Sequence, residues 1–141
     1  MFFTERLCLR GFQDEDKDQL IAMMSDPRIA PNITIGFWRP VRPGYGDVLK
    51  KAYENGFWSS VVVTREGNEF VGMLMLHLLT DTPNRNPELS ICITHDQQSK
   101  GYGGEMLQFL LKHAFTELGM HRVYLEVLEG NVGAISLYKR W

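Results

Sequence analysis

Cysteine is scarce in this 141-residue sequence, and so are the features that mark secreted or membrane proteins. The two cysteines, Cys8 and Cys92, form neither a CxxC pair nor a disulfide framework, which is typical of a reducing compartment. The longest apolar run, Val71 to Leu79, is far shorter than the roughly 20 residues that cross a bilayer. Because no basic region followed by an apolar one opens the chain, we expect no secretory signal, no membrane partner and a cytoplasmic or nuclear location. Nothing in the sequence indicates a metal site.

Neither positive nor negative charge is in large excess in this sequence. The chain has 15 basic and 17 acidic residues, a formal net charge of −2, and neither sign gathers in a run or tail. The sequence therefore does not indicate a nucleic-acid partner. A length of 141 residues suits one domain with a single substantial core, so we expect one domain over residues 1–141.

Hydrophobic periodicity predicts alternating strands and helices. The valines from Val61 to Val63 and the apolar run that follows predict an antiparallel hairpin with a connection of about four or five residues. The acids from Asp14 to Asp16 predict a helix that Asp14 caps. Strands are expected over Leu7–Gly11, Phe57–Thr64, Phe70–Leu79, Leu89–Ile93 and Arg122–Leu128, and helices up to Asp26, over Asp47–Glu54, up to Leu118 and over Asn131–Arg140.

Proline and glycine concentrate between Ala30 and Gly46, which predicts an irregular segment. Phe37 and Trp38 lie within this segment. They either line a site or fill the core, and we favour the core because aromatic side chains pack wherever buried area is needed.

The glycine-rich stretch from Gln98 to Gly104 follows the expected strand Leu89–Ile93 and precedes a long amphipathic helix. At such a turn the first N–H groups of the helix have no intrahelical partner and the helix dipole is positive. Missing Cβ atoms let a phosphate approach the main chain. Glycine-rich turns also precede many helices for steric reasons alone, so the turn by itself leaves both interpretations open.

Two motifs, one helix apart, carry a resemblance to a known family. Gln98, Gly101 and Gly103 match the coenzyme A signature Q/R-x-x-G-x-G/A. The second motif, N-x-x-A-x-x-L-Y, is matched by Asn131, Ala134, Leu137 and Tyr138. The chain thus resembles the GCN5-related N-acetyltransferase (GNAT) family. The resemblance implies an α+β fold in which helices cover both faces of a twisted, mostly antiparallel central sheet.

A narrower likeness concerns two other stretches. Thr4–Arg10 and the Pro87-Glu88-Leu89 entry to the central strand are similar to the subgroup that acetylates ribosomal-protein and other N-termini and small amines. The resemblance therefore implies direct transfer of an acetyl group from acetyl coenzyme A (acetyl-CoA) to a primary amine of one of these kinds. Nothing in the loops Ala30–Gly46 and Thr80–Glu88 distinguishes the acceptors.

The resemblance also implies where the cofactor binds. Backbone N–H groups from Lys100 to Gly104 would hold the pyrophosphate, and the edge of the strand Leu89–Ile93 would pair with the pantetheine amides. A main-chain N–H within Ile91–Ile93 would polarise the thioester carbonyl. The cofactor residues implied in this way are Ile91, Cys92, Ile93, Gln98, Ser99, Lys100, Gly101, Tyr102, Gly103, Gly104, Asn131, Ala134 and Tyr138.

Proton transfer needs an acid and a base. Tyr138 matches the family's acid, a phenol whose ordinary pKa is near 10, although a tyrosine here is also a plausible core residue. Glu88 is our first choice for the base, acting through water, although a carboxylate at a strand entrance is as often merely solvated. His95 and His121 are weaker alternatives. Asn131 either bonds the cofactor or caps the last helix.

The last expectation concerns the end of the sequence. Family members continue beyond the helix of Tyr138 into two further strands, whereas this sequence ends at Trp141. We therefore expect a GNAT domain without its last two strands, whose exposed strand 122–128 invites pairing in a homodimer. Two other functions stay open: a catalytically silent coenzyme A binding module, and a protein that binds ATP or NAD at the glycine turn.

Overall fold

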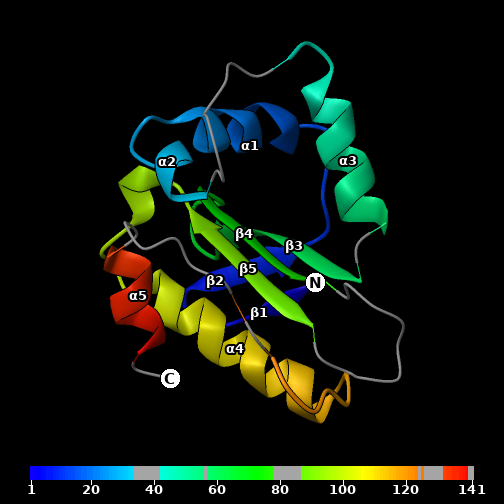
Figure 1. Ribbon diagram of the computed structural model, residues 1–141, viewed down its shortest axis with the longest axis vertical. Coiled ribbons are helices and arrows are strands. Elements are labelled where there is room, and N and C mark those ends of the chain that lie inside the picture. Colours follow the sequence, from blue (N-terminus) through cyan, green and yellow to red (C-terminus); the bar gives the residue numbers. More distant parts are fainter. Residues whose placement is uncertain (34–41, 56, 78–86, 124, 126–131, 140–141) are drawn as a thin grey trace.

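The computed structural model describes residues 1–33, 42–55, 57–77, 87–123, 125 and 132–139, which form a mixed α/β structure. Its five-stranded sheet has the order β1-β2-β3-β4-β5, and every neighbouring pair is antiparallel (Figure 1). The α+β class and the central hairpin, β3 with β4, are confirmed. The strands are β1 (Phe2–Phe3), β2 (Leu7–Arg10), β3 (Trp58–Thr64), β4 (Phe70–His77) and β5 (Glu88–Ile93).

Helices lie on both sides of the sheet, with α1, α2 and α3 on one side and α4 and α5 on the other (Figure 1). Gly119, at φ +65°, follows α4 near the predicted end of that helix. In the described part of the chain, no helix is long and apolar enough to cross a membrane. The helices are α1 (Asp16–Ser25), α2 (Ala30–Ile33), α3 (Tyr45–Asn55), α4 (Tyr102–Thr116) and α5 (Val132–Tyr138), with a short 3-10 helix, η2, at His95–Gln97.

Both faces of the sheet are buried because strand side chains alternate between them. Val62 belongs to the core under α4, whereas Val61 and Val63 belong to the core under α1 and α3. The first core contains Leu7, Leu9, Val71, Leu74, Leu76, Leu89, Met106, Leu107, Leu110, Ala114 and Met120. The second contains Cys8, Leu20, Met23, Ile29, Leu49, Tyr53 and Met75.

The start of α1 differs from the prediction that Asp14 caps it. Glu15 holds the cap position, without a side-chain hydrogen bond there. The carboxylate of Asp16 accepts hydrogen bonds from the Arg10 guanidinium at 2.8 and 2.9 Å and from the Gln13 backbone N–H at 2.8 Å. Because Asp16 is buried and paired with a cation, this acid, two residues after Asp14, joins α1 to β2.

The segment expected to be irregular, Ala30–Gly46, is helical at both ends. The backbone N–H of Ala30 donates to the carbonyl of Asp26 at 2.8 Å, and α2 begins there. Gly44, at φ +81°, precedes α3, which begins at Tyr45. Phe37 and Trp38 lie outside the described residues, so the prediction that they fill the core stays a prediction.

The strand expected over 122–128 is not formed by the part of that range that the structure describes. Arg122, Val123 and Leu125 belong to no strand, and the rest of the range lies outside the described residues. Val123 and Leu125 are half-buried and pack against the core under α4. Their alternating pattern is therefore explained by packing, and the pairing of 122–128 in a homodimer stays a prediction.

Candidate active site

The glycine turn joins β5 to α4 as the sequence predicts. After β5 and η2, Ser99 and Gly101 have positive φ values of 63° and 84°, and α4 starts at Tyr102. Gly101 caps α4 without a side-chain hydrogen bond. Because Glu105 is the first residue whose N–H reaches back to the carbonyl of Gly101, at 3.2 Å, the N–H groups of the preceding helical residues have no partner within the helix.

Glycine occupies three positions of the turn for different physical reasons. Gly101 supplies the left-handed conformation. A Cβ on Gly103 would lie 3.0 Å from Cδ2 of Leu137, so this glycine lets α4 approach α5. A Cβ on Gly104 would meet nothing within 4 Å, and its φ is not positive. The fold itself therefore gives no reason for glycine at 104, whereas a ligand approaching the helix N-terminus would.

Side chains of the β1–β2 connection contact the turn and fix its conformation. Arg6 Nη1 donates to the carbonyl of Lys100 at 2.8 Å, and Arg6 Nε lies 3.0 Å from Oε1 of Glu105. The guanidinium also lies 4.6 Å from the ring centre of Tyr102. Thr4 donates its hydroxyl hydrogen to the same glutamate. We call Thr4, Arg6 and Glu105 the turn clamp.

Glu105 is ionised in this arrangement. Burial by itself favours the neutral acid, but the hydrogen bonds from Thr4 and Arg6 outweigh it and hold the pKa of Glu105 below its ordinary value. An ionised carboxylate in the first turn of α4 also suits the positive end of that helix. Sequence reasoning missed the clamp, although it singled out Thr4–Arg10 as a family-like stretch.

Two side chains of the turn are engaged inside the protein. Gln98 Nε2 donates to the carbonyl of Ile93 at 3.0 Å, and Lys100 Nζ donates to Oε1 of Gln97 at 3.0 Å. Both residues therefore shape the turn with their side chains. A contact of either with a cofactor would come from the backbone.

Helix α5 brings Tyr138 to the same region. Leu137 contacts Gly103 at the start of α4, and Tyr138 packs half-buried against the core that contains the end of β5. Burial, with a smaller contribution from the Cys92 thiol, raises the pKa of Tyr138 to about 12. Burial likewise raises the pKa of Cys92 to about 12, so both groups are protonated at neutral pH. Ala134 lies half-buried on α5, and Asn131 lies outside the described residues.

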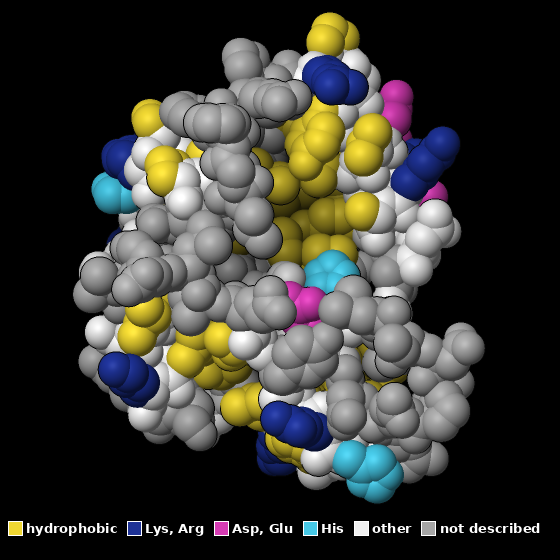
Figure 2. Space-filling view, viewed as in Figure 1, with side chains coloured by type: hydrophobic (Ala, Val, Ile, Leu, Met, Phe, Trp, Pro, Cys, Tyr) yellow, Lys and Arg dark blue, Asp and Glu magenta, His cyan; other side chains and the backbone are white. Residues whose placement is uncertain are grey.

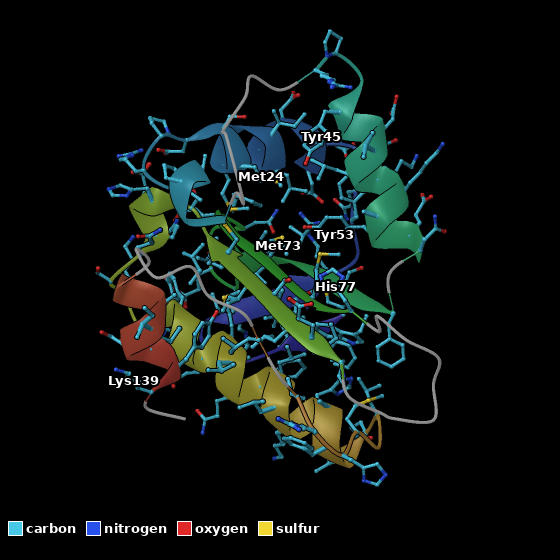
Figure 3. The ribbon with its side chains drawn as sticks, in the orientation of Figure 1. Met24, Tyr45, Tyr53, Met73, His77 and Lys139 are labelled. Carbon is cyan, nitrogen blue, oxygen red and sulfur yellow. The ribbon has the colours of Figure 1, made fainter. Side chains whose placement is uncertain are left out.

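On the opposite face of the sheet the surface is hollowed between α1, α3 and β4 (Figure 2). Figure 3 places Met24 of α1, Tyr45 and Tyr53 of α3, and Met73 and His77 of β4 around this space. We call it the methionine–tyrosine hollow. Figure 2 shows an apolar interior with a histidine ring at its edge, where Figure 3 labels His77.

Glu88 reaches this hollow through strand register. Glu88 is paired with His77 across the β4–β5 ladder, and paired residues present their side chains on the same face. Ser90, two residues along on that face, is hydrogen-bonded to His77, with Oγ 3.1 Å from Nε2. The two histidines weighed as bases lie elsewhere: His95 is exposed in η2, and His121 is exposed after α4. The sequence signal for His77 was an ionisable residue interrupting an apolar strand.

Comparison with known proteins identifies the family. The family described as "Acetyltransferase (GNAT) domain" matches residues 6–141. The chain belongs to this family, whose enzymes transfer an acetyl group and use acetyl-CoA as the donor.

Two similar proteins have names that describe N-acetyltransferases. The protein named "Uncharacterized N-acetyltransferase p20" from Bacillus licheniformis is 28% identical over 141 residues, which cover 96% of this chain and 77% of that protein. "Spermine/spermidine N(1)-acetyltransferase" of Bacillus subtilis is 33% identical over 98 residues, which cover 66% of this chain and 64% of that protein. The match therefore spans less than two thirds of the Bacillus subtilis protein, and small-amine acetyltransferases are among the relatives.

Solved structures share the fold. A GNAT-family acetyltransferase from Bacillus anthracis superposes with a TM-score of 0.83 at 21% identity, covering 98% of this chain and 80% of that chain. The spermidine N-acetyltransferase from Vibrio cholerae, crystallised with CoA and spermine, superposes with a TM-score of 0.79 at 22% identity, covering 97% and 80%. The GNAT fold expected from the motifs is confirmed.

Proposed function

We propose that this protein, as a single GNAT domain over residues 1–141, acetylates a small primary amine by direct attack on acetyl-CoA. The observation that carries the proposal is the position of β5. One end of this strand leads through η2 into the glycine turn, and the other end, at Glu88, reaches the methionine–tyrosine hollow. A single strand thus connects a place for the acyl donor with a place for the acceptor.

The donor side fits acetyl-CoA through its backbone. The N–H groups of Tyr102, Gly103 and Gly104 would hold the pyrophosphate at the positive end of α4. In the part of the chain that the structure describes, β5 pairs only with β4, so its other edge offers N–H and C=O groups to the pantetheine amides. A main-chain N–H within Ile91–Ile93 would polarise the acetyl carbonyl.

The acid and base follow from the same geometry. With a pKa of about 12, Tyr138 is a weaker acid than a thiol, whose ordinary pKa is about 8.5, so complete transfer to a free thiolate is unfavourable. Its hydroxyl would instead donate a hydrogen bond to the sulfur while the C–S bond breaks. Glu88 would take the proton of the amine through an intermediary, in the simplest case a water molecule.

The choice of a small amine is supported by relatives whose names specify spermine and spermidine. Protein N-termini are the second acceptor class to be tested. A cytoplasmic location fits the proposal because the enzyme needs acetyl-CoA and both Cys8 and Cys92 are free thiols. The relatives come from Bacillus and Vibrio, which gives no support to a nuclear location.

Turnover tests the proposal. Coenzyme A release from acetyl-CoA should be measured as free thiol with a panel of small primary amines and short peptides, beside thermal melting with each ligand. We expect acetyl-CoA at about 100 times its Kd to stabilise the fold by about 2.7 kcal/mol, and at least one amine to stimulate thiol release. Stabilisation without release would indicate a silent binding module. Stabilisation by ATP or NAD but not by coenzyme A would indicate a nucleotide-binding protein.

A further inference from the structure

His77 is the residue that the proposed function leaves unused. It is half-buried at the end of β4, with Glu88 as its register partner and Ser90 as its hydrogen-bond partner. The bond to Ser90 places Nε2 of His77 at the residue that precedes Ile91, and neighbouring residues along a strand are about 3.3 Å apart. One ring nitrogen of His77 therefore lies at the residue that precedes the part of β5 that we assign to the acetyl carbonyl.

The walls above His77 are apolar. Met24, Tyr45 and Met73 belong to the half-buried residues that pack against the core under α1 and α3. Tyr53 belongs to that core and is 7% exposed, yet among the described residues its hydroxyl has no hydrogen-bond partner. A buried hydroxyl normally has one, so leaving this buried oxygen unpaired costs free energy.

The charges near the hollow argue against a polycation. Asp16, the buried acid of α1, is already paired with Arg10. Within the described residues, the register places Glu88 opposite His77 and the Cys92 thiol, which is protonated at neutral pH, opposite Met73. A second or third ammonium group would lie against thioether and phenyl surface, where an unpaired charge is costly. One amine on an apolar body suits this lining.

We propose that the methionine–tyrosine hollow binds a primary amine carried on an apolar body, and that His77 at its polar end takes the proton from that amine. This inference rests on the proposed acetyl transfer and names its acceptor class. His77 becomes the intermediary between the amine and Glu88, whose carboxylate stabilises the imidazolium that forms.

The proton and electron balance is simple. With the Nε2 hydrogen donated to Ser90, Nδ1 of His77 accepts one proton from the ammonium group and leaves a lone pair on the amine nitrogen. That nitrogen forms the C–N bond with the acetyl carbon, while the C–S bond breaks and its electron pair leaves on sulfur. The second nitrogen proton ends on that sulfur, and the first passes from His77 to Glu88 and from there to solvent.

Replacement of His77 tests the proton step. A positioned general base contributes about 100-fold or more, so His77→Ala should lower kcat about 100-fold without changing the KM for acetyl-CoA, and added imidazole should restore part of the rate. His95→Ala and His121→Ala, at the exposed histidines, are matched controls and should keep wild-type kcat. Unchanged kcat in His77→Ala, or no rescue by imidazole, would overturn the role of His77.

A conservative variant covers the case in which His77→Ala fails to fold. Ser90→Ala keeps the imidazole but removes the hydroxyl that orients it. We expect kcat to fall about five-fold, with the melting shift by acetyl-CoA unchanged. A Ser90→Ala enzyme with wild-type kcat would contradict the relay.

An acceptor panel tests the ligand class. Hexylamine and 2-phenylethylamine should be acetylated with kcat/KM at least about ten-fold above that of spermidine, since the additional ammonium groups of spermidine would lie against apolar surface. Met24→Glu should reverse this preference, whereas Phe115→Glu, a matched change at an exposed site on α4, should leave it unchanged. Preference of the wild-type enzyme for spermidine would overturn the inference and leave the acetyltransferase intact. If no amine is acetylated and acetyl-CoA does not shift the melting curve, the proposed function itself fails.

Discussion

The glycine turn and the methionine–tyrosine hollow differ in how their polar groups are satisfied. At the turn, Arg6 bonds the Lys100 carbonyl and Glu105, and the amide of Gln98 bonds the Ile93 carbonyl. In the hollow, the described polar contacts are sparse: His77 bonds Ser90, and the hydroxyl of Tyr53 has no partner among the described residues.

The difference fits the proposed function, in which the turn would hold acetyl-CoA and the hollow would hold the amine. A cradle of backbone N–H groups works only if its conformation is fixed, and side chains from a distant part of the sequence fix it. Methionine side chains have flexible torsions and can adapt to different apolar shapes. We infer that the donor side is built for one ligand, whereas the acceptor side can change its specificity through a few wall residues.

The largest expected effect is at Gly104. Gly104→Asp should leave the fold intact, because a Cβ there meets nothing within 4 Å and an acid suits the start of a helix. The same charge would repel a pyrophosphate, so the Kd for acetyl-CoA should rise about 100-fold, or about 2.7 kcal/mol. Isothermal calorimetry and thermal melting without ligand measure the two quantities. Unchanged affinity would show that the turn is only a helix start.

The next effect concerns Tyr138. Tyr138→Phe should lower kcat about 30-fold with little change in the Kd for acetyl-CoA, because the phenol acts only as the sulfur leaves. Stability gives a second measurement. The folded pKa of about 12 lies above the ordinary value near 10, so the phenol's contribution is complete below about pH 10 and is lost as pH rises toward 12. Denaturant titrations should show Tyr138→Phe losing less stability than wild type across that window.

The turn clamp should give a smaller effect. The Arg6 side chain is 44% exposed, so its ion pair with Glu105 contributes little to global stability. Its bond to the Lys100 carbonyl fixes the turn, and Arg6→Gln should raise the Kd for acetyl-CoA about five-fold while the free energy of unfolding changes by less than about 1 kcal/mol. Lys17→Gln is a suitable control, since Lys17 forms an ion pair with Asp47 between α1 and α3, on the other side of the sheet from the turn. Equal losses in both variants would argue against the clamp.

The geometry of the glycine turn was predictable from sequence for a physical reason. Positive φ at Gly101, close approach at Gly103 and a helix N-terminus each require particular residue types at fixed spacing, so the motif is local. The sequence signals that predicted the hairpin of β3 and β4 were equally local. The clamp could not be predicted in the same way, because Arg6 and Glu105 meet only once the sheet and α4 are assembled.

The acceptor side and two element boundaries escaped prediction because they depend on tertiary packing. His77 was visible as a polar interruption of β4, but its pairing with Ser90 depends on strand register. Asp16 replaces Asp14 at the start of α1 because Arg10 of the neighbouring strand selects it. Val123 and Leu125 alternate like a strand yet serve as packing residues in the described part of the chain.

The smallest expected effect is at Tyr53, and it has the opposite sign to changes at the clamp. Its hydroxyl is buried without a partner among the described residues, a situation that costs free energy, and burial raises its pKa. Tyr53→Phe should therefore stabilise the unliganded protein by up to about 1 kcal/mol, a melting shift of about 3 °C.

The same change should leave the KM for the acceptor and the KM for acetyl-CoA near their wild-type values, because the hydroxyl oxygen is buried away from the surface of the hollow. Phe12, which packs on the Tyr53 ring at 5.2 Å between centroids, supplies the control: Phe12→Leu removes ring contact without touching a hydroxyl and should destabilise the protein. A destabilised Tyr53→Phe protein would mean that the hydroxyl has a hydrogen-bond partner in solution. The contrast between a turn whose polar groups are hydrogen-bonded and a hollow whose polar groups are not would then be lost.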